Sequence, residues 1–418
     1  MKKIHNAEIL CVGTEVLLGD VINTNAAYLA RKLSELGIAI TRHTAISDDP
    51  KLLSDALSSA FENADLVVTS GGLGPTFDDL TKETVAAYFG RKMEMRYDIL
   101  EGIKGYFQRL GRIMTPNNEK QAMMPEGATV FPNNYGTAPA LALSDENGKT
   151  VIMLPGPPGE LTRLFEEQAA PYLRERCGDC AIASRNMYIF GMGESMVETK
   201  LGALMSAESN PTVAPYCKEG EVRLRVTAKA ATDAEALALC DKTIEKIMAT
   251  EVGQFVYGID IGCLEAAVVA RLKEKKLTLA TAESLTGGLI SKRITDISGA
   301  SAVLLGGCVT YTNEIKQKLL GVSEKTLEVF GAVSAECAME MAKGVREKLG
   351  ADIGVSATGI AGPDGGTDNT PVGTVFIGIS TKEGKSFRKL SLTAKRSREY
   401  IRIVSASNAY DMILKATE

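Results

Sequence analysis

Histidine is almost absent from this chain: His5 and His43 are the only two among 418 residues. The region after residue 260 therefore lacks the side chain that most often serves as a general base near neutral pH. Any hydrolytic nucleophile in that region must be activated by a lysine, a tyrosine or a carboxylate instead.

Long apolar runs are also missing, since no stretch of 18 or more apolar residues occurs. The first residues, Met1 to Asn6, contain no apolar core of a secretory signal. A membrane-spanning helix needs about 20 predominantly apolar residues. We therefore expect a cytoplasmic protein that has no membrane partner.

An excess of positive charge is missing too: 47 lysines and arginines stand against 52 aspartates and glutamates, a net charge of −5. A large nucleic-acid footprint needs clustered basic residues that displace counterions. This balance argues against nucleic acid as a partner and favours small molecules.

Cysteine pairs with the spacing of a metal or redox site are rare. The eight cysteines are scattered, which suits reduced and mostly buried thiols better than a disulfide framework. Only Cys177 and Cys180 have metal-like spacing, and a zinc site would need a second such pair. We expect a structural or incidental role for these two thiols.

The composition is otherwise that of an ordinary globular protein, with 45% hydrophobic and 24% charged residues. The length predicts two or three domains. Near the amino terminus, strand and helix patterns alternate: strands are predicted at residues 7–13, 38–45 and 66–70, and helices at 24–36 and 51–60. This βαβαβ order predicts an α/β fold, in which helices cover a parallel sheet.

A glycine-rich turn at residues 71–79 follows the third predicted strand and contains Gly71, Gly72, Gly74 and Thr76. In open α/β sheets ligands bind beyond the carboxyl ends of the strands, and such a turn presents N–H groups to phosphate. The turn ends in two acidic residues that could hold a divalent cation or simply cap the next helix. A second glycine- and proline-rich turn, at residues 154–160, is predicted to face the same crevice.

The stretch from Thr281 to Gly288 follows one predicted strand and precedes a predicted helix, so Ser284 lies at a strand-to-helix turn. Gly287 and Gly288 allow close backbone approach, and the free N–H groups of a helix start attract an anion or an oxyanion. The motif predicts a nucleophilic hydroxyl or a phosphate site. The alternative is that Ser284 or Thr286 only caps the helix.

The two turns at 71–79 and 154–160 are accompanied by Gly13-Thr14-Glu15, Asp48-Asp49 and Gly136-Thr137-Ala138-Pro139. Together these motifs resemble the molybdopterin-binding-like domain that begins members of the CinA family of competence- and damage-inducible proteins. The resemblance implies a nucleotide-binding domain at residues 1–172, with metal-dependent ADP-ribose pyrophosphatase activity in some relatives. It also implies substrate contacts from the glycines and threonine of the first turn, and ligands for a divalent metal, such as magnesium, or for phosphate: Asp48, Asp78 and Asp79.

Residues 173–256 differ in texture: a strand is predicted at 184–189, a helix from Glu194, a hairpin of 212–217 with 221–230, and a long helix from Asp233. They resemble the small KH-like connecting domain of the same family. The Gly-x-x-Gly clamp that KH modules use on RNA is absent, so we expect a spacer.

Residues 257–418 carry A-E-S-x-T-G-G at 282–288, V-T-Y-x-N-E-x-K at 309–316 and A-T-G-I-A-G-P at 357–363. They resemble the C-terminal domain of the CinA family, which also occurs alone as nicotinamide-nucleotide amidohydrolase. The resemblance implies that Ser284 or Ser301 is the nucleophile and that Lys316, with Tyr311, is the base; no cofactor is expected. It places in the substrate site Thr286, Gly287, Gly288, Thr358, Gly359, Gly362, Arg398 and Arg402. Where the family reads G-D-R-x-x-x-R, this chain keeps both arginines but not the Gly-Asp turn.

Three functions are compatible with these motifs. The first is a nicotinamide mononucleotide deamidase of NAD salvage, made bifunctional by a pyrophosphatase-like N-terminal domain. The second is a nucleotide pyrophosphatase whose C-terminal domain is accessory. The third is a non-enzymatic accessory protein of DNA uptake or repair, against which the acidic composition argues. We expect nucleotides as small-molecule partners and a homodimer.

Overall fold

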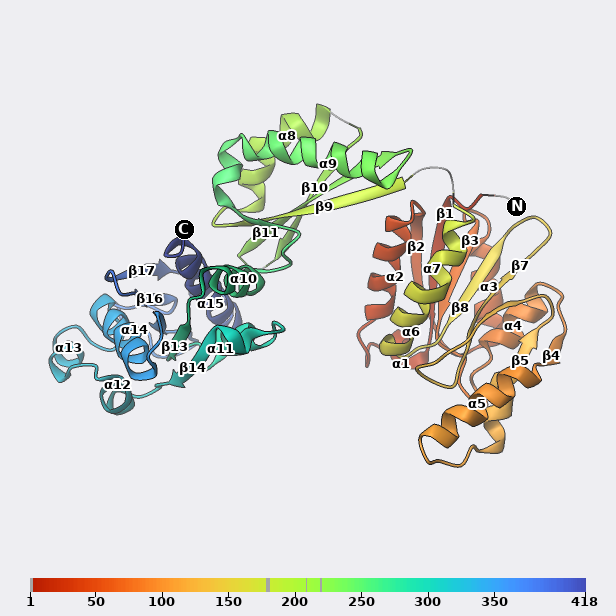
Figure 1. Cartoon of the computed structure of the whole chain (residues 1–418), viewed down its shortest axis with the longest axis horizontal. Helices are drawn as coiled ribbons and strands as arrows, with labels where there is room; N and C mark the ends of the chain where they lie inside the picture. Colours follow the sequence, from red (N-terminus) through yellow and green to blue (C-terminus); the bar gives the residue numbers. More distant parts are fainter. Residues whose placement is uncertain (1–2, 178–180, 208, 219) are drawn as a thin grey trace. The chain divides into compact units, whose positions relative to one another are not determined.

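The structure is a computed structural model that describes residues 3–177, 181–207, 209–218 and 220–418 (Figure 1). The chain groups into two compact units, Met1–Ser184 with Ala228–Leu239, and Arg185–Thr227 with Cys240–Glu418. The predicted α/β fold class is confirmed, whereas the domain boundaries near residues 172 and 256 remain predictions. Of the described helices, none is long and apolar enough to cross a membrane. Cys180 lies outside the described residues, and Cys177 is a half-buried free thiol.

The N-terminal sheet has six strands in the order β2-β1-β3-β8-β7-β6. The first four are parallel, and β7 and β6 are antiparallel to their neighbours. The elements in chain order are β1 (Asn6–Val12), α1 (Thr14–Leu17), α2 (Thr24–Glu35), β2 (Ala39–Ile46), α3 (Pro50–Ala60), β3 (Leu66–Ser70), α4 (Thr81–Tyr88), β4 (Met93–Met95), α5 (Tyr97–Arg109), β5 (Met123–Pro125), β6 (Thr129–Phe131), β7 (Ala140–Ser144), β8 (Thr150–Leu154), α6 (Pro158–Leu164) and α7 (Ala170–Arg174).

Helices cover both faces of this sheet because successive residues of a strand point to opposite sides. Ile9 of β1 packs with Leu29 and Leu33, which are one helical turn apart on α2. The next residue, Leu10, belongs to the core on the other face, where it meets Leu53 of α3. With every central strand covered, open access to the sheet remains at the strand ends.

The connecting region contains a second sheet, in the order β10-β11-β9-β12. The predicted hairpin forms with Thr212 opposite Thr227 and Cys217 opposite Val222. The elements are β9 (Ala181–Phe190), α8 (Glu194–Ala207), β10 (Thr212–Lys218), β11 (Glu221–Ala230), α9 (Asp233–Met248) and β12 (Val256–Ile259).

The C-terminal sheet has the order β14-β13-β15-β16-β17. The first three strands are parallel to one another, β16 pairs antiparallel with β15, and β17 pairs antiparallel with β16. Leu279 of β13 packs in the core with α10, α11 and α15, and Ala280 packs on the other face against Met341 of α14. The elements are α10 (Leu264–Lys275), β13 (Leu279–Glu283), α11 (Leu289–Thr295), β14 (Leu304–Val309), α12 (Asn313–Leu320), α13 (Glu324–Val329), α14 (Ala335–Leu349), β15 (Ile353–Gly359), β16 (Thr374–Ser380), β17 (Lys385–Ser391) and α15 (Arg398–Lys415).

Candidate functional site

The first candidate site lies at the carboxyl ends of β13 and β14. Ser284 follows β13 directly, and its amide donates to the carbonyl of Ala357 on β15 at 2.9 Å. The helix after β14, α12, is capped by Thr312 and carries Lys316 on its first turn. Lys316 Nζ lies 3.2 Å from Ser284 Oγ, and the two residues are only 2% and 8% exposed. The structure thus brings this predicted pair within hydrogen-bond distance.

The burial of Lys316 makes its ammonium proton easier to lose. Its Nζ also lies 3.0 Å from the carbonyl of Thr310 and 3.3 Å from that of Tyr311. Among the ion pairs of the described residues, none joins a carboxylate to this lysine. Burial lowers the pKa of Lys316. The neighbouring Cys337 thiol has a pKa raised by burial to about 11, so it adds no charge at neutral pH.

Glu283 occupies the start of α11, where the sequence predicted an anion or oxyanion site. Its buried carboxylate accepts from the amides of Gly288, Ile290 and Ser291 at 2.9–3.0 Å. These are the N–H groups that a helix start leaves free, so the chain's own carboxylate already satisfies them. The expectation of an external anion at this helix start is therefore wrong.

Two arginines one helical turn apart on α15 border the same site. Arg398 donates to the carbonyl of Gly362 at 2.8 Å and to the Tyr311 hydroxyl at 3.1 Å. Arg402 donates to the carbonyl of Thr286 at 2.7 Å. The side chain of Tyr311 is 61% exposed, and only its backbone carbonyl contacts Lys316. Its hydroxyl therefore belongs with Arg398, and it does not assist the lysine directly.

Ser301 is not brought into this cluster. Ser301 is exposed and lies in the 3-10 turn Ala300–Ala302, which precedes β14, whereas Ser284 follows the parallel strand β13. At about 3.3 Å per residue, the strands separate the two hydroxyls by roughly 15 Å. Within one chain, Ser301 therefore cannot act with Lys316, which corrects the expectation that both serines share one site.

Two predicted substrate contacts are interior residues. Thr358 is 1% exposed and donates to the carbonyl of Ala332 at 2.7 Å, and the fully buried Thr286 hydroxyl has no partner. Neither hydroxyl is open to a ligand, so their predicted direct contacts are not supported. Gly287, Gly288 and Gly362 have positive φ angles, and Gly359 ends β15. At Gly287 the φ of 59° favours glycine, whereas a Cβ there would stand at an ordinary contact distance of 3.6 Å from the Arg402 guanidinium.

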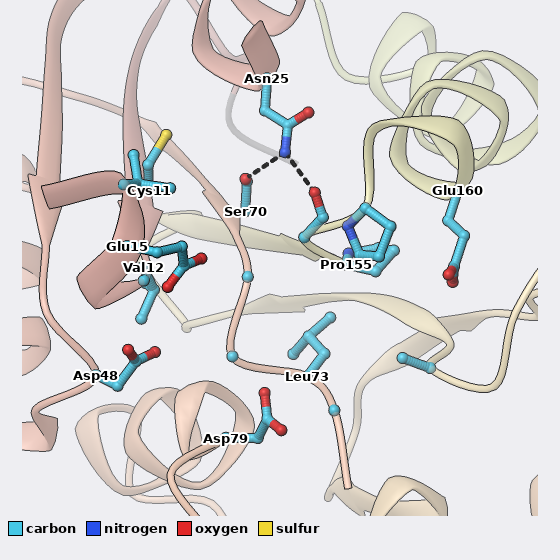
Figure 2. Close-up of a pocket in the computed structure, with 18 of the residues that line it drawn as sticks. Cys11, Val12, Glu15, Asn25, Asp48, Ser70, Leu73, Asp79, Pro155 and Glu160 are labelled. Carbon is cyan, nitrogen blue, oxygen red and sulfur yellow. Dashed lines mark hydrogen bonds between the residues drawn. The ribbon is translucent and has the colours of Figure 1, made fainter. Parts of the chain in front are cut away.

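The second candidate site is a cavity of about 440 Å³ at the carboxyl ends of β1, β2, β3 and β8 (Figure 2). β1 lies between β2 and β3, so chain order reverses there, which is where open α/β sheets bind ligands. The predicted Gly71, Gly72, Gly74 and Thr76 all line the cavity. Gly71 has a φ of 104°, and a Cβ there would stand 2.1 Å from the carbonyl oxygen of Val12, so only glycine fits.

Carboxylates gather at this cavity. The three predicted aspartates line it together with Glu15 and Glu160. Figure 2 shows Asp48 and Asp79 with the two glutamates. Asp48 accepts from the amide and hydroxyl of Thr14, at 2.9 and 3.0 Å. Thr76 Oγ1 lies 2.5 Å from a carboxylate oxygen of Asp78 and of Asp79, and this contact lowers the pKa of Asp78.

These oxygen donors suit a hard divalent cation. Among the described residues, no three histidine, cysteine, aspartate or glutamate side chains lie close enough to form a complete metal cage. Magnesium does not need one, because it is usually held by one or two carboxylates, several waters and the phosphates of the substrate. The donor set therefore fits a cation that binds together with a phosphorylated ligand.

Several site residues were missed by the sequence analysis. In the N-terminal cavity, Asn25 donates to Ser70 Oγ at 3.1 Å and to the carbonyl of Gly156 at 2.7 Å (Figure 2). It thereby links the end of β3 to the turn after β8. Two buried residues next to the sites were missed as well. Near the N-terminal cavity, burial lowers the pKa of Lys82 to about 8. Beside Ser284 in the C-terminal site, Glu283 is also buried. The sequence offered one signal for each of these two residues: Lys82 lies close to Asp79, and Glu283 directly precedes Ser284.

Comparisons with known proteins match each region to a family description. Residues 8–175 match a probable molybdopterin binding domain, residues 184–258 the damage-inducible protein CinA KH domain, and residues 262–417 the CinA C-terminal domain. A CinA-like protein of Dictyoglomus thermophilum is 47% identical over 406 residues, which cover 97% of this chain and 98% of that relative. A putative competence-damage inducible protein of Clostridium tetani is 49% identical over 384 residues, 92% of this chain and 93% of the relative.

Among solved structures, the competence/damage inducible protein CihA from Agrobacterium tumefaciens is 37% identical and covers 37% of this chain and 94% of its own, with a TM-score of 0.36. The family resemblance of the motifs is confirmed by the three domain matches and by relatives that align over nearly their whole length. The chain therefore belongs to the CinA family of competence- and damage-inducible proteins.

Proposed function

We propose that the C-terminal site hydrolyses the carboxamide of nicotinamide mononucleotide and releases ammonia, a step of cytoplasmic NAD salvage. The observation that carries the proposal is the 3.2 Å contact between Lys316 Nζ and Ser284 Oγ in a buried setting without a carboxylate partner. Neutral Lys316 can donate its two N–H groups to the carbonyls of Thr310 and Tyr311. Its lone pair then faces the Ser284 hydroxyl, as a general base must.

The reaction follows the logic of Ser-Lys pairs. Ser284 Oγ forms a bond with the carboxamide carbon, its proton moves to Lys316 Nζ, and the carbonyl electron pair moves onto oxygen. When the tetrahedral intermediate collapses, the C–N bond breaks and Lys316 returns the proton to the nitrogen, which leaves as ammonia. Water then hydrolyses the acyl-enzyme with the same lysine as base. Arg398 and Arg402 supply positive charge at the rim for the nucleotide phosphate.

The test is ammonia release from nicotinamide mononucleotide by the full chain and by two matched serine variants. Ser284→Ala should lose turnover, and Ser301→Ala should retain it because Ser301 lies at the other end of β14. If Ser301→Ala were inactive and Ser284→Ala active, the assignment of Ser284 would fail, and a second copy would have to supply the nucleophile. If the unmodified chain releases no ammonia, the deamidase proposal itself falls.

For the N-terminal cavity the proposed function is metal-dependent cleavage of a nucleotide pyrophosphate such as ADP-ribose. Support comes from the carboxylate-lined cavity at the position where the sheet reverses its chain order. One or two of Asp48, Asp78 and Asp79 would hold the cation, which when bound would neutralise phosphate charge and activate water. The turn glycines let backbone approach the phosphates, and Asn25 holds the turn after β8 in place. Cleavage measured with magnesium and then with excess chelator tests this function.

A further inference from the structure

Two lysines connect the acidic loop of the N-terminal cavity to the body of the domain. Lys120 Nζ donates to the carbonyl of Thr76 at 2.9 Å and to that of Asp79 at 2.5 Å. These carbonyls stand at the two ends of the loop Thr76–Asp79, which carries two of the three predicted metal ligands, Asp78 and Asp79. The ammonium group of Lys120 thus connects the two ends of the loop through their backbone carbonyls.

Lys82 holds the segment from which Lys120 projects. Its side chain is 2% exposed, and its Nζ donates to the carbonyls of Lys120 at 3.0 Å, Gln121 at 3.2 Å and Met123 at 3.0 Å. All three N–H groups of the ammonium are therefore used on one short stretch of backbone. The two sets of contacts form a series: Lys82 binds the segment 120–123, and Lys120 of that segment binds the acidic loop.

The charges explain why such a support is needed. Asp78 and Asp79 both lie 2.5 Å from the single hydroxyl of Thr76, so two like charges are held close together on an exposed loop. Like charges at this separation repel one another, which favours opening of a loop that has only local contacts. The ammonium of Lys120 binds carbonyl oxygens of the same loop rather than the carboxylates of Asp78 and Asp79, which line the cavity.

We propose that Lys120 and Lys82 are positioning residues of the N-terminal site: Lys120 holds the acidic loop in its cation-binding conformation, and Lys82 acts only through Lys120. The inference rests on the proposed pyrophosphatase function. The stability of the loop and its affinity for a cation can nevertheless be measured without an assay of enzymatic turnover. Groups that orient metal ligands from outside the coordination shell typically contribute about 10–100-fold to metal affinity.

The experiment uses the full chain with Lys120→Met, Lys82→Met, the double variant and Lys120→Arg, which keeps the charge. Lys104→Met is the matched control, because Lys104 pairs with Glu101 at the surface of α5. Two quantities are measured: amide hydrogen exchange of residues 74–80 and the dissociation constant for Mn²⁺. Lys120→Met should speed exchange in this segment and raise the dissociation constant about 10–100-fold, whereas Lys104→Met should change neither.

The double variant distinguishes a serial arrangement from two independent supports. If Lys82 acts through Lys120, the double variant should bind Mn²⁺ no more weakly than Lys120→Met, because coupled sites are not additive. Additive losses would overturn the proposal, as would exchange and affinity within twofold of the unmodified protein in Lys120→Met. Should Lys82→Met fail to fold, Lys120→Met and Lys120→Arg alone decide. If the unmodified chain binds no Mn²⁺, the pyrophosphatase function falls, and the exchange data still decide the role of Lys120.

Discussion

Replacement of Lys316 by methionine should remove most ammonia release while leaving the fold intact. Methionine keeps much of the buried stem and deletes the amine that lies 3.2 Å from Ser284 Oγ. Removal of a general base typically costs about 10²–10⁴ in rate, which corresponds to about 3–5 kcal/mol of transition-state stabilisation. Lys316→Arg should not rescue activity, because a guanidinium stays protonated and cannot accept the serine proton.

The effect on stability has two parts of opposite sign. Loss of the amine leaves the carbonyl of the fully buried Thr310 without this donor, which costs about 1–3 kcal/mol. The substitution also removes the cost of burying an ionisable amine, and it is this burial that lowers the pKa of Lys316. Because the folded-state pKa of Lys316 lies below the usual lysine value of 10.5, the unfolded chain binds the extra proton between these two values. Stability of the unmodified protein should therefore rise with pH across that window, and Lys316→Met should lose this rise.

The assay is initial-rate ammonia release from nicotinamide mononucleotide at several pH values, with urea unfolding of both proteins as the stability control. In the unmodified enzyme kcat should rise with pH as Lys316 loses its proton, with a midpoint below 10.5. Near-normal turnover in Lys316→Met, or an unchanged pH profile of its residual rate, would refute the role of this lysine as base.

Arg398→Ala should raise KM for nicotinamide mononucleotide more than it lowers kcat, since its charge is proposed to bind the phosphate in ground and transition states alike; an unchanged KM in substrate titrations would contradict this. Glu283→Gln should lower the free energy of unfolding by about 1.5–3 kcal/mol, because a neutral amide replaces a charged acceptor of three backbone N–H groups, and urea denaturation measures the loss. Asp78→Asn with Asp79→Asn should abolish metal-dependent ADP-ribose cleavage and leave ammonia release unchanged, since the proposed sites use separate residues; paired assays on one preparation decide.

Local sequence patterns sufficed for much of the fold. The helix predicted at residues 24–36 forms as α2, because its cap, Asn23, and its buried stripe with Leu29 and Leu33 are encoded within the segment itself. The hairpin of β10 and β11 could be predicted because its turn and its strand lengths are encoded within about 20 residues. The order of strands in each sheet was not accessible, because it depends on contacts between residues far apart in the chain.

The site was predictable where motif residues follow the ends of parallel strands. Ser284 and Lys316 follow β13 and β14, so both lie at the same edge of the sheet. Ser301 precedes β14 and therefore lies at the opposite edge, a distinction that the motif resemblance did not make. The role of Glu283 was not predicted either. Its carboxylate reaches the backbone N–H groups at the start of α11 only because the turn between β13 and α11 folds back on itself.

Burial alone does not identify a catalytic lysine in this chain. Lys82 and Lys316 are each 2% exposed, each donates to backbone carbonyls, and burial lowers the pKa of both. Only Lys316 has a hydroxyl within hydrogen-bond distance, whereas three carbonyls use every donor of Lys82. Lys82→Met should therefore leave ammonia release unchanged, while Lys316→Met abolishes most of it. Comparable losses in both variants, measured at equal folded fractions, would show that the Ser284 contact is not what makes Lys316 a base.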